Sequence, residues 1–190
     1  MHLGVEEEIL VVKTHYFDAG DLASIEAKLK TKDGYEFVFF GVHPPPPSPT
    51  EEKTSKERDG DLLSIAKKVR NYKIPVLVSG DFNNVAWAYS SQLFRKTSEL
   101  IDARIGRGIF ATFHAKHWFF RVPLDLLYPS IGSDHFPLGF SFFIYCEYDE
   151  QKEEIKTLEN GEIHEVNQLI KEGKKEKSDN REEVATEDEI

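Results

Sequence analysis

The pattern of apolar and polar positions centres on residues 75–80, where an apolar run lies between a proline and a glycine. Apolar runs of this length with such boundaries are typical of strands buried on both faces. Asp81 and Asn83 follow directly, and alternate positions of an extended chain point to the same side. The pattern therefore predicts a buried strand whose end carries two aligned polar groups.

The preceding part of the chain predicts three more strands. Residues 9–12 are apolar, and residues 25–30 alternate between apolar and charged positions, as half-buried strands do. Lys32-Asp33-Gly34 is a hairpin turn signal, so residues 35–42 are the expected return strand.

Helices are predicted where apolar residues recur at helical spacing, in residues 57–71 and 87–100. Two further short strands are expected at 124–128 and 136–145. Strands that alternate with helices in this way favour an α+β domain in which helices pack against a sheet.

Charge divides the chain into two parts. The net charge of the 190 residues is −10, and residues 149–190 hold 15 acidic and 7 basic residues, which leaves −2 for the part before them. We therefore expect a folded domain over 1–148 and an acidic tail over 149–190, with one short helix after Gly161 and otherwise disordered. The nearly neutral domain does not favour DNA as a partner.

Composition also bears on location. Cys146 is the single cysteine, which excludes an internal disulfide and suits a reducing compartment. The most apolar stretch, residues 136–146, is too short to span a bilayer, and residues 1–8 lack the pattern of a signal peptide. A cytoplasmic chain without a membrane span is the expectation.

Residues with candidate chemistry gather in four motifs, three of them at predicted strand ends. Together they supply carboxylates, a carboxamide and two imidazoles. Carboxylate oxygens are preferred ligands of Mg²⁺, and amide and imidazole N–H groups donate to phosphate oxygens. The motifs are Gly41-Val42-His43-Pro44, Gly80-Asp81-Phe82-Asn83, Arg121-Val122-Pro123-Leu124-Asp125 and Ser133-Asp134-His135-Phe136-Pro137.

The Gly-Asp-Phe-Asn and Ser-Asp-His pieces, in this order and each beside an apolar strand, resemble the endonuclease/exonuclease/phosphatase superfamily of metal-dependent phosphohydrolases. The resemblance covers about residues 21–143, and the run from Pro75 to Pro137 looks closest to bacterial members of unassigned substrate, which often carry membrane helices before the catalytic domain. It implies a DNase I-like fold, a four-layer α/β/β/α sandwich, of which this chain would hold the second half. It also implies Mg²⁺ or Mn²⁺ as cofactor and hydrolysis of phosphate mono- or diesters through in-line attack of water.

The resemblance implies roles for three residues in the first half of the chain. Asp81 would orient or deprotonate the attacking water and help to hold the metal. Asn83 would hold a phosphate oxygen and help to position that water, and His43 would contact the phosphate.

Three residues in the second half complete the implied site. Asp134 would help to bind the metal, His135 would donate to the phosphate, and Asp125 would keep the imidazole of His135 oriented. A hairpin centred on Ser130 would place Asp125 opposite His135, with Cβ atoms about 5 Å apart.

The chain departs from the family pattern in two respects. It begins too late to contain the Asn and the Glu, the main metal ligand, that relatives carry near the start of the domain. Only eight residues separate Asp125 from Asp134, where relatives usually have a longer loop and another strand. The missing strands would leave the inner face of the sheet uncovered, which predicts self-association.

Three functions therefore stay open: a phosphoesterase, a catalytically dead remnant or interaction module, and an enzyme whose missing half is a separate chain. Asp81 and Asn83 after a glycine are also ordinary turn residues. Nucleic acid, phospholipid head groups, inositol phosphates and small phosphate esters are all possible substrates, and we favour a small or lipid-like ester over DNA.

Overall fold

The structure is a computed structural model that describes residues 8–17, 22–45, 53–103 and 157–187. The chain divides into two compact units, residues 1–100 with 155–190 and residues 101–154. All described helices and strands belong to the first unit. The strands expected at 124–128 and 136–145 lie outside the described residues.

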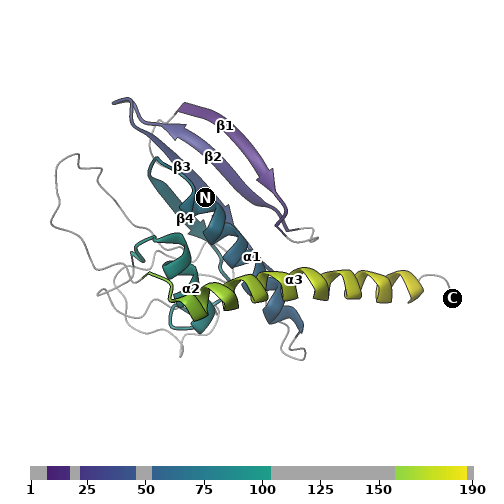
Figure 1. The fold of residues 1–190 in the computed structure, drawn as a ribbon. Coiled ribbons are helices and arrows are strands. Elements are labelled where there is room, and N and C mark those ends of the chain that lie inside the picture. Colours follow the sequence, from purple (N-terminus) through teal and green to yellow (C-terminus); the bar gives the residue numbers. More distant parts are fainter. Residues whose placement is uncertain (1–7, 18–21, 46–52, 104–156, 188–190) are drawn as a thin grey trace, which may run out of the picture. The chain divides into compact units, whose positions relative to one another are not determined.

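This unit contains a four-stranded mixed sheet in the order β1-β2-β3-β4 (Figure 1). β1 (Glu8–His15), β2 (Ser24–Lys30) and β3 (Glu36–Val42) are antiparallel neighbours, whereas β4 (Val76–Gly80) pairs parallel to β3. These elements confirm the four strands predicted around the central motif. The predicted hairpin turn is confirmed as well, because Gly34 has a φ of 90° and its N–H donates to the carbonyl of Thr31 at 2.9 Å.

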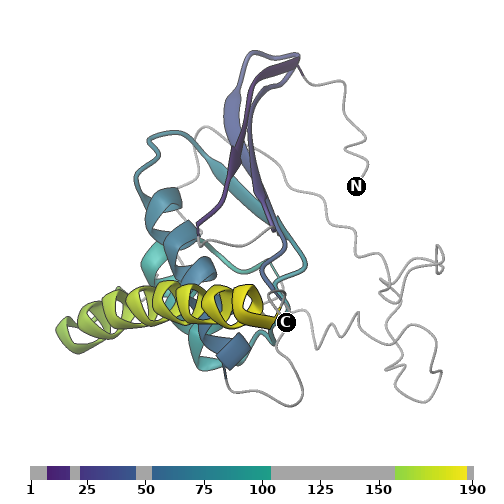
Figure 2. The same cartoon turned by 90° about the vertical axis from the view of Figure 1, so that its right-hand side faces the viewer.

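The parallel pairing requires a crossover connection, and helix α1 (Lys53–Arg70) provides it. Figure 2 shows α1 against one face of the sheet. Val38, Phe40 and Val42 of β3 point to this face and pack with Leu62 and Ile65 of α1. The predicted helix over 57–71 lies within α1, apart from its last residue.

Helix α2 (Tyr89–Ser98) lies within the second predicted helix, 87–100, and packs against α1. The mixed sheet and its helices confirm an α+β fold. The second sheet of the expected four-layer sandwich has no counterpart in the described part of the chain.

Helix α3 (Asn160–Glu187) lies where a short helix was expected after Gly161 and is 28 residues long. Val166 is buried with Leu63 of α1 and Leu93 of α2. Gly173 lies so close to α1 that a Cβ atom there would be 2.7 Å from the carbonyl oxygen of Lys56. Burial of this narrow apolar face stabilises a segment whose charged composition alone indicates disorder.

Burial along β2 differs from the expected pattern of buried apolar and exposed charged positions. Leu29 is buried as predicted, but Ile25 is half exposed and Glu26 is only 5% exposed. Glu26 shares its face with Phe40, its cross-strand neighbour, and this is the face that α1 covers. The helical layer therefore buries a charged position that the sequence pattern assigns to solvent.

The face of the sheet away from α1 is covered unevenly. Phe37, Phe39 and Leu29 form a buried cluster there, whereas Ile9 and Val12 of β1 are exposed. No described helix is long and apolar enough to cross a membrane.

Candidate functional site

The ends of β3 and β4 form the first part of the site. Val42 pairs with Gly80 in the parallel register, so His43 and Asp81 each follow directly after one of two adjacent strand ends. Gly80 has a φ of 150°, and a Cβ atom at this position would lie 2.0 Å from the carbonyl oxygen of Val42. Glycine is therefore required here, because any side chain would collide with β3.

The loop after β4 is folded by its own polar side chains. Asp81 Oδ1 accepts a hydrogen bond from the backbone N–H of Asn83 at 2.9 Å, which closes a turn. Asn83 has a φ of 46°, in the left-handed region that asparagine tolerates better than most residues. Its Nδ2 donates to the carbonyl oxygen of Pro44 at 2.8 Å. Asn83 thus joins the segments that follow β3 and β4.

Helix α2 supports the same loop from the other side. The rings of Phe82 and Phe94 meet edge to face, with centroids 5.4 Å apart. Asn84 Nδ2 donates to Ser90 Oγ at 2.8 Å near the start of α2. These contacts join Phe82 and Asn84 of the loop to α2.

Arg58 of α1 is a further member of the site that the sequence did not predict. Its Nη1 donates to the carbonyl oxygen of Asn83 at 3.1 Å, and its Nε donates to Asp59 Oδ1 at 3.0 Å. Only 11% of its side chain is exposed. The charged stretch around it resembles a solvated loop, and no local sequence signal indicates a partner 25 residues away.

The side chains of His43, Asp81 and Asn83 have the chemistry to bind and attack a phosphate group. His43 is exposed, and Asp81 and Asn83 are partly exposed. A carboxylate can accept a proton, whereas a carboxamide and an imidazole can donate to phosphate oxygens. Pro44 takes one N–H of the Asn83 carboxamide and leaves the second for another acceptor.

The other predicted site residues, Asp125, Asp134 and His135, lie outside the described residues, so the expected Asp125–His135 contact stays a prediction. Among the residues that are described, no three His, Cys, Asp or Glu side chains form a group that could hold a metal ion. Asp81 has the oxygen chemistry that Mg²⁺ prefers, but one carboxylate is too few to hold the ion.

A second polar cluster surrounds Glu26, on the face of the sheet that α1 covers. His15 Nε2 lies 2.6 Å from Glu26 Oε2, and Lys68 Nζ lies 3.6 Å from the same oxygen. Burial opposes ionisation of Glu26, but the hydrogen bonds from Tyr72 and His15 and the charge of Lys68 outweigh it, so the pKa of Glu26 is lowered. Burial and the bond to Glu26 raise the pKa of Tyr72.

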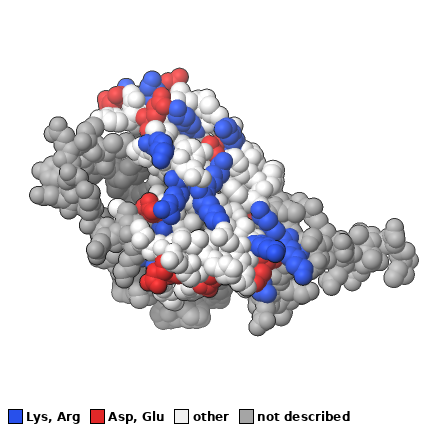
Figure 3. Space-filling model, viewed as in Figure 1, with Lys and Arg blue, Asp and Glu red and all other residues white. Residues whose placement is uncertain are grey.

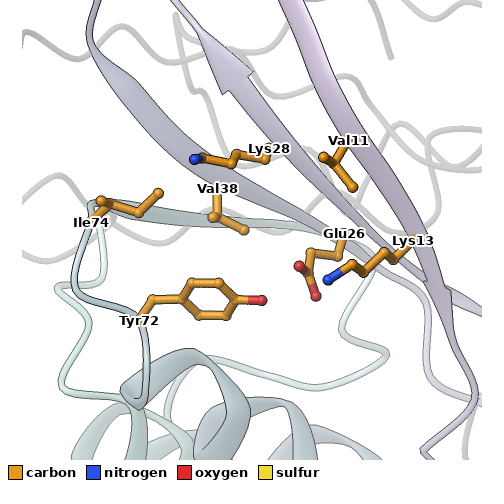
Figure 4. A pocket seen from close by; sticks show the side chains of 7 residues that line it. All are labelled: Val11, Lys13, Glu26, Lys28, Val38, Tyr72 and Ile74. Atoms are coloured by element: carbon orange, nitrogen blue, oxygen red, sulfur yellow. The ribbon is translucent and has the colours of Figure 1, made fainter.

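A pocket of about 280 Å³ adjoins this cluster, and Figure 4 shows the hydroxyl of Tyr72 pointing toward the Glu26 carboxylate at its edge. The lining of the pocket comes from β1, β2, β3 and the segment after α1. It includes no residue of the loop after β4, residues 81–84, which we call the strand-end loop. The lining residues are Val11, Lys13, Glu26, Lys28, Val38, Tyr72 and Ile74.

Comparison with known proteins places the chain in a family. No curated protein matches it. The human Nocturnin catalytic domain, solved with a bound sulfate anion, is similar with 20% sequence identity and a TM-score of 0.39. That match covers 48% of this chain and only 36% of the Nocturnin domain. The family model for "Endonuclease/Exonuclease/phosphatase family" matches residues 1–135, well over half of the sequence, and the chain therefore belongs to this family.

Proposed function

We propose that this chain hydrolyses phosphate mono- or diesters with the help of Mg²⁺ or Mn²⁺. One observation carries the proposal: in a chain of a phosphoester hydrolase family, the parallel pairing of β3 and β4 brings His43, Asp81 and Asn83 to the same end of the sheet. This end supplies both a proton acceptor and hydrogen-bond donors.

In the proposed reaction, Asp81 accepts a proton from a water molecule whose oxygen attacks phosphorus in line with the leaving group. The new P–O bond forms as the ester P–O bond breaks, and the leaving oxygen takes a proton from solvent. The second N–H of the Asn83 carboxamide and the imidazole of His43 donate to the phosphate oxygens.

Asp125, Asp134 and His135 complete this proposal. Asp134 would join Asp81 in holding the cation, and His135, oriented by Asp125, would donate to the phosphate. A bound divalent cation would neutralise negative charge on the phosphate oxygens. In total, two carboxylates from separate parts of the chain would then face the cation.

The substrate proposal rests on charge. The net charge of the chain is −10, and on the face shown in Figure 3 the Lys and Arg side chains are interspersed with Asp and Glu side chains. Proteins that bind the DNA backbone usually gather basic residues on one face. A small or lipid-like phosphate ester is therefore the preferred substrate class.

A second candidate is an interaction module without catalytic activity. It is favoured by the bonds inside the loop, because Asp81 accepts the Asn83 N–H, and Asn83 binds Pro44. Such bonds build a turn whether or not a substrate binds. The exposed Ile9 and Val12 would then offer an apolar surface for self-association.

Hydrolysis of bis(p-nitrophenyl) phosphate and p-nitrophenyl phosphate, measured with Mg²⁺, with Mn²⁺ and with EDTA, separates the two candidates. Asp81→Asn should lower the metal-dependent rate by about 10²-fold or more, as loss of a general base does. The control is Asp33→Asn, which changes an exposed carboxylate in the β2–β3 turn. Equal rates for the wild type and both variants, unchanged by EDTA, would favour the inactive module.

A further inference from the structure

We infer that Arg58 is a positioning residue of the strand-end loop and that catalysis depends on its planar guanidinium. The inference rests on the proposed function. Arg58 acts through the backbone of Asn83, to which it donates a hydrogen bond, and it is assigned no contact with the substrate.

The guanidinium of Arg58 is itself held in one orientation. Asp59 Oδ1 accepts from Nε at 3.0 Å and lies 2.9 Å from Nη2, so two adjacent nitrogens are fixed by one oxygen. The remaining nitrogen, Nη1, then points at the carbonyl oxygen of Asn83. A planar group with several fixed donors can orient a carbonyl in a way that a single ammonium group cannot.

The hydrogen bond from Arg58 to the carbonyl of Asn83 helps to hold the orientation of this residue. The left-handed φ of this residue, 46°, sets how its side chain and its carbonyl group are turned relative to its own N–H. With the carbonyl bound to Arg58, the backbone N–H reaches Asp81 and the carboxamide reaches Pro44. Loss of Arg58 would remove one of the three hydrogen bonds that hold Asn83, the residue proposed to hold the phosphate.

This arrangement predicts a selective effect on turnover. A displacement of about 1 Å at a reacting group can cost about 10²-fold in rate. Arg58→Met should therefore lower kcat by about 10-fold to 100-fold with a smaller change in KM. Arg58→Lys keeps the charge but has no planar fork, so it should recover only part of kcat.

Arg70→Met is the matched control, because Arg70 also lies on α1 and its Nη2 is 2.6 Å from Glu99 Oε1. This pair is more exposed, with 46% of the Arg70 side chain accessible, and Glu99 lies at the end of α2, outside the strand-end loop. The kinetic constants of all variants are measured with Mg²⁺ and bis(p-nitrophenyl) phosphate.

Hydrogen exchange of the Asn83 backbone N–H provides a readout that does not require activity. Exchange should be faster in Arg58→Met than in Arg70→Met. The inference is overturned if exchange at Asn83 and kcat are the same in both variants, or if Arg58→Lys restores kcat fully. An inactive wild type in which Arg58→Met still accelerates exchange would remove the proposed function but keep Arg58 as the anchor of the loop. If Arg58→Met fails to fold, Arg58→Lys decides by the same two measurements.

Discussion

Asn83 donates its side-chain amide to the carbonyl oxygen of Pro44 at 2.8 Å and so links the segments after two parallel strands that are far apart in sequence. The two residues come from separate predicted motifs of the chain. Their contact makes one polar site from the ends of β3 and β4.

Replacement of Asn83 separates the contribution of this hydrogen bond from that of the backbone conformation. Asn83→Gly removes the bond to Pro44 and should lower the free energy of unfolding by about 1 kcal/mol. Asn83→Ala also places an alanine at a φ of 46° and should cost about 1 kcal/mol more. Urea denaturation of both variants measures the difference. Equal stability of the two would contradict a left-handed Asn83.

Close contact between β3 and β4 makes Gly80 intolerant of any side chain. Gly80→Ala should destabilise the protein by about 3 kcal/mol, because the new Cβ atom would lie 2.0 Å from the Val42 carbonyl oxygen. Gly34→Ala is the control, since Gly34 also has a positive φ but has no atom within 4 Å of the Cβ position. It should cost only about 1 kcal/mol. A Gly80→Ala variant as stable as Gly34→Ala would exclude the parallel register described for these strands.

The cluster around Glu26 should make stability depend on pH in the acid range. The pKa of Glu26 is lowered from its ordinary value of 4.5, so its contribution is fully present above that value and is lost as pH falls through the folded-state pKa. Glu26→Gln should therefore flatten the dependence of the urea midpoint on pH below about 4.5.

Tyr72 should contribute to the same cluster through its hydroxyl group. Tyr72→Phe removes a donor to Glu26 and should cost about 1 kcal/mol at neutral pH. Tyr16→Phe, at an exposed position, should leave the urea midpoint unchanged. If both variants behaved alike, the hydrogen bond to Glu26 would have no part in stability.

Packing of α3 against α1 can be tested at two glycines of the same helix. Gly173→Ala should separate the helices, because its Cβ atom would lie 2.7 Å from the Lys56 carbonyl oxygen, and should cost about 2 kcal/mol. Gly161→Ala meets no atom within 4 Å and should be neutral or stabilising by up to about 1 kcal/mol. Thermal unfolding together with limited proteolysis of α3 distinguishes them. Equal protease resistance in both variants would argue against the packing of Gly173.

Local patterns explain why part of the fold could be predicted from the sequence. The run before Gly80 and the turn at Gly34 are set by residues next to one another, so their elements were predicted correctly. The burial of Glu26 was not predicted, because it depends on α1, which begins 27 residues later in the chain. Arg58 was not predicted as a site residue for the same reason. Its partner Asn83 is 25 residues away in the sequence and lies near it only in the folded protein.

The C-terminal helix shows a different limit of sequence patterns. The charged residues in its sequence outnumber the apolar ones, so composition indicates disorder. Val166 nevertheless packs in a core with Leu63 and Leu93, which only tertiary structure reveals. For the candidate site, His43, Asp81 and Asn83 follow adjoining strand ends, but their roles remain predictions, as do the roles of Asp125, Asp134 and His135.

The first compact unit combines residues 1–100 with residues 155–190, so α3 is synthesised after the helices that it packs against. Until Val166 leaves the ribosome, Leu63 and Leu93 lack their apolar partner from α3. During this interval Leu63 and Leu93 form an exposed apolar surface on the nascent chain, which is the kind of surface that chaperones bind.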